Sequence, residues 1–217
     1  MEWFWKNNRD LLLSLAFGLA SFILRYISLN QTPYPNGWDG YYYVMQAHSW
    51  LTYGHLQSLD YSLIYPYFTL LSYLVGDYVL AFKVGAALLA GALSVATFYL
   101  FTHDGEGRWK AILFSSYLIF SPTLTYFISQ FPKNALGLIF FLLLLRSIDS
   151  RRRWQSFIFA VLSLLTHRMT GGLSLLVLFL VGISRFHWKW VVTGLIAMGI
   201  LSLLPGILHI SDLQRFK

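Results

Sequence analysis

The chain has 217 residues, of which 57% are hydrophobic and only 12% are charged, whereas about a quarter of the residues in a soluble domain are charged. The net charge of +7 gives no reason to expect a nucleic acid as partner, because most basic residues stand in short clusters between apolar runs, as membrane topology signals do. The chain has no cysteine, which excludes disulfides, thiolate metal sites and cysteine nucleophiles within it. We therefore expect an all-α integral membrane protein that consists of a single membrane domain.

Seven apolar runs are predicted to cross the bilayer as helices, since backbone groups in lipid must be satisfied within the segment. In chain order they are residues 11–29, 78–102, 111–130, 134–146, 154–166, 170–184 and 190–210. A further run, residues 62–76, is interrupted by tyrosines and a proline and suits either a short span or a helix at the membrane surface. Pro122 and Pro205 are expected to kink the third and seventh spans.

The distribution of basic residues decides whether residues 62–76 cross the membrane. If they do not, ten basic residues fall on the side of the N-terminus: Lys6, Arg9, Arg108, Lys110, Arg146, Arg151, Arg152, Arg153, Arg185 and Lys189. Four fall on the other side: Lys133, Arg168, Arg215 and Lys217. Because cytoplasmic loops are enriched in Lys and Arg, we expect seven spans in the plasma or inner membrane, with the N-terminus in the cytoplasm and the C-terminus outside. Residues 30–77 then form an outer loop with two surface helices, about residues 40–53 and 62–76.

The outer loop, residues 30–77, is acidic and aromatic and contains no lysine or arginine. Such a segment between spans is where a membrane protein can carry out chemistry. Of its three aspartates, Asp60 and Asp77 are expected to cap neighbouring helices. Asp39, in Asn-Gly-Trp-Asp-Gly, suits either a cap or turn residue or a catalytic carboxylate.

Short spans predict a cluster of cations at membrane depth. Residues 154–166 make a helix of about 20 Å, well short of a hydrocarbon core of about 30 Å. Lys133, His167 and Arg168 would therefore lie below the outer surface, where polar backbone is tolerated when it lines a cavity. We predict a shared anion site there. The alternative is that Lys133 and Arg168 extend their side chains to the lipid headgroups.

Four segments, in order, resemble one family. They are Trp-Asp-Gly-Tyr-Tyr-Tyr (38–43), Ile-Tyr-Pro-Tyr (64–67), the stretch 129–146, and Leu-Leu-Thr-His-Arg-Met-Thr-Gly-Gly (164–172). This ordered combination resembles the C-superfamily (GT-C) of membrane glycosyltransferases, such as protein mannosyltransferases and lipid A aminoarabinose transferases. The resemblance covers nearly the whole chain. Two features depart from it: Lys133 and Asn134 stand where many members have an acidic residue, and members usually have 400 residues or more.

The resemblance implies transfer of a hexosyl or pentosyl group from a polyprenyl-phosphate donor to an acceptor on the non-cytoplasmic face. Asp39 would be the catalytic base, or a ligand of a divalent ion such as Mg or Mn. Lys133, His167 and Arg168 would hold the donor phosphate. Weaker candidates for substrate contact are Trp38, Tyr41, Tyr42, Arg25 and Lys83. The aromatic residues among them suit a membrane-interface belt equally well.

Two other functions remain open at this stage. A transporter of a lipid-linked or anionic substrate would explain the cations without a role for Asp39, although no inverted repeat supports it. A non-catalytic or truncated membrane subunit of the same fold is favoured by the length of the chain.

Overall fold

The computed structural model describes residues 2–184 apart from 59 and 103–106, together with residues 192–194 and 196. The described part of the chain forms helices and turns without strands, so the all-α class is confirmed. In chain order the helices are α1 (Glu2–Leu29), α2 (Trp38–Tyr53), α3 (Ile64–Val75), α4 (Tyr78–Phe101), α5 (Arg108–Phe120), α6 (Pro122–Gln130), α7 (Pro132–Asp149), α8 (Arg153–Thr166) and α9 (Arg168–Ser184).

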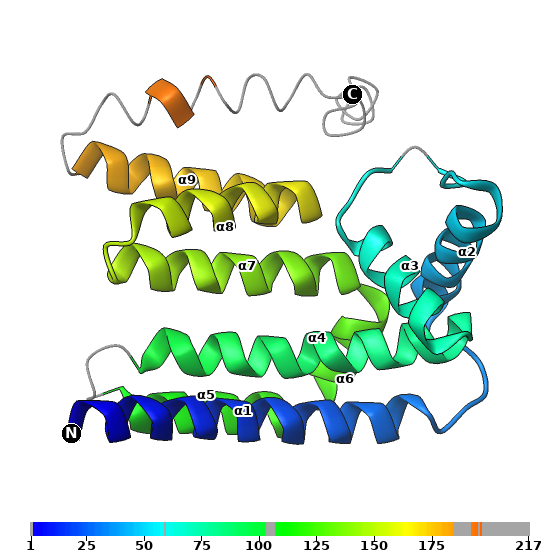
Figure 1. The fold of residues 1–217 in the computed structure, drawn as a ribbon, viewed down its shortest axis with the longest axis horizontal. Coiled ribbons are helices and arrows are strands. Elements are labelled where there is room, and N and C mark those ends of the chain that lie inside the picture. Colours follow the sequence, from blue (N-terminus) through cyan, green and yellow to red (C-terminus); the bar gives the residue numbers. More distant parts are fainter. Residues whose placement is uncertain (1, 59, 103–106, 185–191, 195, 197–217) are drawn as a thin grey trace.

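Most of the long helices lie side by side along the long axis of the molecule (Figure 1). The packing runs from α1 to α4, from α4 to α7, from α7 to α8 and from α8 to α9, with α5 against α1 and α4. The two helices of the predicted outer loop, α2 and α3, lie together at one end of this bundle and pack on α4. The N-terminus lies at the opposite end (Figure 1).

Among the described helices, two are long and apolar enough to cross a membrane: residues 9–29 of α1, and α4. α5 and α6 together are also long and apolar enough, although they meet at an angle of 70°. They make a third span if they count as one broken helix. The described residues therefore support two or three membrane-length helices and not the seven spans predicted from the sequence, because α7, α8 and α9 do not meet the length and hydropathy of a full span. The last predicted span, residues 190–210 with Pro205, falls mostly outside the described residues.

Two predicted spans have different boundaries in the structure. Residues 111–130 are not one kinked helix but two, α5 and α6, because Pro122 opens a new helix after the extended Ser121. The fourth run, residues 134–146, is part of a longer helix, α7, that begins with Pro132 at its N-terminus and has 18 residues. Lys133 is therefore in the first turn of α7 rather than in a loop. The fifth run is short as predicted, with 14 residues in α8.

Buried aromatic rings attach the outer helices to the bundle. Tyr43 of α2 stacks on Phe82 of α4 with ring centroids 6.3 Å apart, and it lies 6.1 Å from Tyr65 of α3. Phe68 of α3 contacts Tyr43 and Phe82 in the same cluster. All four side chains are buried, so burial of their apolar surface holds α2 and α3 against α4.

Candidate functional site

An ion pair joins the outer loop to the bundle. Lys133, in the first turn of α7, donates to Oδ2 of Asp60, which lies between α2 and α3. The same oxygen accepts a hydrogen bond of 2.7 Å from the Tyr65 hydroxyl. The Lys133 ammonium also lies 5.0 Å from the centroid of the Tyr65 ring, within range of a cation–π contact. Asp60 was expected to cap a helix, and that expectation is wrong, because α3 begins after Leu63.

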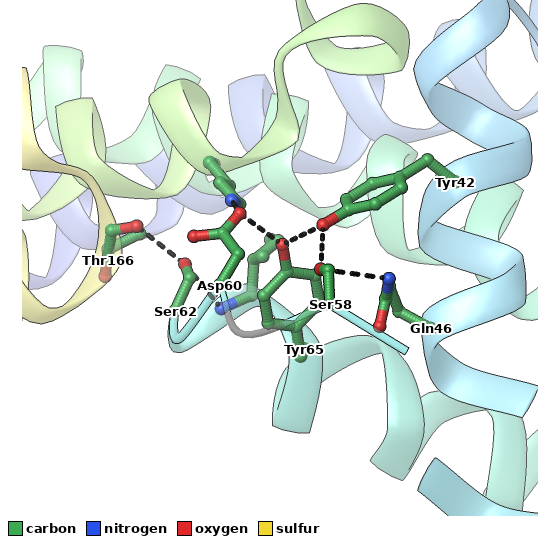
Figure 2. A network of polar contacts seen from close by, with 9 residues as sticks. Tyr42, Gln46, Ser58, Asp60, Ser62, Tyr65 and Thr166 are labelled. Atoms are coloured by element: carbon green, nitrogen blue, oxygen red, sulfur yellow. Dashed lines mark hydrogen bonds and ion pairs between the residues drawn. The ribbon is translucent and has the colours of Figure 1, made fainter. Parts of the chain in front are cut away.

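Hydrogen bonds extend from this pair into α2, as Figure 2 shows. The hydroxyls of Tyr65 and Tyr42 are 3.0 Å apart, and the Tyr42 hydroxyl is 2.7 Å from Oγ of Ser58. Gln46 donates to Ser58 from its Nε2 atom at 3.2 Å. Tyr42, predicted as a weak substrate contact, is thus a half-buried link between α2, α3 and the ion pair.

The loop before α3 is also bound to the end of α8. Ser62 donates from Oγ to the Thr166 carbonyl at 2.6 Å, and the Leu63 amide donates to the Leu165 carbonyl at 3.2 Å. These two bonds satisfy carbonyls in the last turn of α8, which have no partner within that helix. Because His167 follows directly, the contacts bring Asp60 close to the junction of α8 and α9.

The predicted cations gather around the Asp60 carboxylate. Partial burial raises the pKa of Asp60. Hydrogen bonds from Lys133 and Tyr65 and the charges of Lys133 and Arg168 lower this pKa by more than burial raises it, so the pKa of Asp60 lies below its usual value. Burial lowers the pKa of His167, the charges of Lys133 and Arg168 add to this effect, and Asp60 opposes it. His167 is therefore neutral at pH 7, and its buried Nδ1 atom has no hydrogen-bond partner. The structure thus brings Lys133, His167 and Arg168 together, and the shared anion site that the sequence predicts there stays a prediction.

Two helix N-termini add to the positive charge of this cluster. α7 begins at Pro132 and α9 begins at Arg168, and the N-terminus of a helix carries a partial positive charge that attracts anions. Lys133 and Arg168 lie in these first turns, where a cation is normally unfavourable. An anion between the two helix ends would therefore be stabilised by side chains and backbone together.

Asp39 lies near the same cluster without a capping role. It is half-buried in the first turn of α2, whose N-cap residue is Gly37, and no side chain caps this helix. Among the described residues, the Asp39 carboxylate has no hydrogen-bond or ion-pair partner, so Asp39 does not cap α2. Burial raises the pKa of Tyr43, and the charges of Asp39 and Asp60 raise it further. The two carboxylates therefore lie within electrostatic range of one phenol.

The weakly predicted Arg25 has a structural role. Its Nη2 atom donates to the carbonyls of Leu118, Ile119 and Ser121 at 2.8, 2.7 and 2.7 Å. The carbonyls of Leu118 and Ile119 belong to the end of α5, where the helix breaks and leaves them without an intrahelical partner, whereas the Ser121 carbonyl also accepts from the Leu124 amide. Arg25 is 3% exposed and its guanidinium caps this break, so its role is to stabilise the fold and not to contact a substrate.

The other weak candidates divide in the same way. Lys83 is buried and donates to the carbonyl of Thr32, so it holds the chain that follows α1 rather than a substrate. Trp38 and Tyr41 lie on the outer surface of α2, and the Trp38 side chain is 92% exposed. Their position suits a surface contact but not the buried cluster around Asp60.

The described residues offer no enclosing set of protein ligands for the divalent ion that the resemblance allows. Magnesium takes oxygen ligands in octahedral geometry, and no group of three His, Asp or Glu side chains gathers in this part of the chain. Asp60 is also occupied by Lys133 and Tyr65.

An apolar pocket of about 210 Å³ adjoins the cluster. It is lined by Trp50, Leu56, Tyr61, Ser62, Leu63, Pro66 and Leu165. Ser62 and Leu165 also belong to the contact between the loop and α8. The pocket therefore lies beside the cluster, because its lining residue Leu165 is two residues before His167 in the chain.

No family model matches the chain, and neither a curated protein nor a solved structure is significantly similar to it. Sequence reasoning missed Asp60 and Tyr65. The available signal was Lys133 itself, because a cation next to apolar helices calls for a counter-ion, and the loop between α2 and α3 offers an aspartate.

Proposed function

We propose that the protein is a membrane glycosyltransferase that moves a sugar from a polyprenyl-phosphate donor to an acceptor on the non-cytoplasmic face. One observation carries the proposal: Lys133 of α7, His167 at the junction of α8 and α9, and Arg168 of α9 lie together, and Asp39 of α2 has no partner among the described residues. Cations and helix N-termini suit a phosphate. An unpaired carboxylate nearby suits a general base.

The proposed reaction forms one bond and breaks another. An acceptor hydroxyl attacks the anomeric carbon of the sugar, and Asp39 takes the proton of that hydroxyl. The bond between the anomeric carbon and the phosphate oxygen breaks, and its electron pair leaves with the polyprenyl phosphate. Lys133 and Arg168 neutralise the charge that develops on this phosphate, while neutral His167 donates an N–H. The apolar pocket beside Leu165 would take the first part of the polyprenyl chain.

The proposal includes seven spans, with the N-terminus in the cytoplasm and the C-terminus outside. It is supported by the arrangement in Figure 1, where the N-terminus and the connection from α7 to α8 lie at the end of the bundle opposite α2 and α3. Arg151, Arg152 and Arg153 belong to that connection. With these basic residues in the cytoplasm, the candidate site faces outward, where lipid-linked sugars are used by the family that the sequence resembles.

The first test is binding of polyprenyl monophosphate to the purified protein, measured by native mass spectrometry. We expect the wild type to bind one lipid, and Lys133→Ala and Arg168→Ala each to weaken binding about tenfold or more, since a hydrogen bond to a charged group contributes about 1.5–3 kcal/mol. The matched control is Lys110→Ala, which removes an exposed cation from the N-terminal part of α5 at the opposite end of the bundle. It should bind as the wild type does.

A second test separates catalysis from binding. Asp39→Asn should keep the affinity for polyprenyl monophosphate and abolish transfer from polyprenyl-phosphate sugars, because the amide cannot accept the acceptor's proton. A folded wild type that binds no lipid phosphate would refute the donor site. Binding without transfer in the wild type, across a panel of donors, would favour the non-catalytic subunit or the carrier instead.

A further inference from the structure

The ion pair between Lys133 and Asp60 occupies the position that a bound phosphate would need. The Lys133 ammonium has the Asp60 carboxylate against it and the Tyr65 ring 5.0 Å away. The Lys133 side chain is only 16% exposed, whereas that of Asp60 is 40% exposed. The carboxylate is therefore the more accessible partner, and an anion that approaches Lys133 from the solvent meets a like charge.

Asp60 is held by contacts that can be exchanged. Its Oδ2 atom accepts from both Lys133 and Tyr65, and a phosphate oxygen can replace it as the acceptor of the Lys133 ammonium. The residue stands in a loop rather than in a helix, so its side chain can turn to water without loss of a helical hydrogen bond. Half exposure also means that the released carboxylate can be hydrated at little cost.

We propose that Asp60 is an internal competitor for Lys133: its carboxylate fills the anion site of the resting protein, and the phosphate of the ligand displaces it. This inference rests on the proposed function, because it needs the same anion site. The competition lowers the apparent affinity by the fraction of molecules in which Asp60 has left Lys133. After transfer, the return of Asp60 to Lys133 helps to release the polyprenyl phosphate product.

The test compares affinities in variants of the full chain. Asp60→Asn keeps the shape of the side chain and one oxygen that can accept from Lys133, but it removes the competing charge. We expect it to bind polyprenyl monophosphate about tenfold more tightly than the wild type by native mass spectrometry, since a neutral group competes far less well for an ammonium. Lys133→Ala should weaken binding about tenfold or more, and Asp60→Asn should bring no gain when it is combined with Lys133→Ala. Asp77→Asn is the matched control, because Asn caps α4 as well as Asp does.

Inorganic phosphate distinguishes the headgroup from the lipid chain. If the competition is for the phosphate, Asp60→Asn should also increase the rise in Tm that inorganic phosphate produces. A gain for the lipid alone would place the effect at the hydrocarbon chain and overturn the proposal. Unchanged or weaker binding in Asp60→Asn, with binding weakened in Lys133→Ala, would overturn the inference and leave the donor site intact. Wild-type affinity in Lys133→Ala would instead refute the site itself.

A second variant keeps the test decisive if Asp60→Asn does not fold. Tyr65→Phe keeps the ring beside Lys133 and every charge of the cluster, but it removes the hydroxyl that donates to Asp60. The carboxylate is then held less firmly, and we expect lipid binding to tighten about twofold to threefold. Binding that weakens in Tyr65→Phe would mean that Tyr65 serves the ligand rather than Asp60, and it would count against the competition.

Discussion

At the scale of single residues, the two buried cations of the predicted spans show how a polar group is accommodated in an apolar bundle. Arg25 donates to three carbonyls at the end of α5, and Lys83 donates to one carbonyl after α1. In both cases the partner is backbone that irregular geometry leaves unsatisfied. A buried cation near a helix break is therefore as much evidence of a cap as of a ligand site.

Replacement of Arg25 tests this role. Arg25→Met keeps much of the apolar volume but leaves the carbonyls of Leu118 and Ile119 without a donor, so we expect the free energy of unfolding in detergent to fall by about 2 kcal/mol or more. The matched control is Arg9→Met, the same change at an exposed position of the same helix. An equal loss of stability in both variants would contradict the capping role.

The pKa of His167 predicts how stability depends on pH. Burial and the nearby cations hold this pKa below its usual value of 6.5, so below pH 6.5 the unfolded chain takes up a proton before the folded protein does. Stability should therefore fall as the pH drops from about 6.5 toward the folded pKa. The contribution of Asp60, whose pKa is also lowered, is lost only near pH 4 and below.

The measurement is the Tm at pH 7.5 and at pH 5.5. The wild type should lose more Tm between the two values than His167→Gln, which has no titrating ring. His48→Gln, at an exposed position of α2, serves as control and should behave as the wild type does. If the wild type and His167→Gln show the same decrease, the buried neutral imidazole is refuted.

At the scale of elements, the start of α2 depends on one glycine. Gly37 has a φ of 77° and a ψ of 170°, a conformation that is almost confined to glycine. A Cβ atom there would also lie 1.2 Å from Nε2 of Gln130 at the end of α6. The glycine thus lets the first turn of α2, with Asp39, approach the bundle closely.

Gly37→Ala should therefore lower the free energy of unfolding by about 1–3 kcal/mol through backbone strain. Under the proposed function it should also reduce sugar transfer, because Asp39 is two residues away. Gly172→Ala is a suitable control: this glycine lies in α9, and its Cβ would meet nothing within 4 Å. A Gly37→Ala protein with wild-type Tm would show that the turn can relax.

The element boundaries show what the sequence could and could not predict. The two surface helices were predicted to within about two residues, because glycines at 54 and 76 end them in left-handed turns. The sequence predicts a kink at Pro122, whereas the structure has two separate helices, α5 and α6. A proline alone does not show that Arg25 donates to the carbonyls at the break and so stabilises it. The role of Asp60 was missed because it depends on a contact with Lys133, 73 residues away, and no local pattern encodes such a distance.

At the scale of the whole molecule, the bundle predicts a topology that labelling can test. The chain has no cysteine, so single cysteines can be placed without a background. Thr52→Cys on α2 should react with a membrane-impermeant maleimide in intact cells. Gln155→Cys, in the first turn of α8 at the opposite end of the bundle, should react only after permeabilisation. Both sites are exposed, and the reverse pattern would invert the proposed orientation.

The contact between the loop before α3 and the end of α8 has a consequence for biosynthesis. The hydrogen bond from Ser62 cannot form until Thr166, 104 residues later in the chain, has been synthesised. Translation of that stretch takes about 5–20 s at about 5–20 residues per second, whereas α1 and α4 can pair as soon as both are inserted. The nascent protein therefore passes through a stage in which the outer helices can pack on α4 but have no contact with α8, and the candidate site closes only when α8 is made.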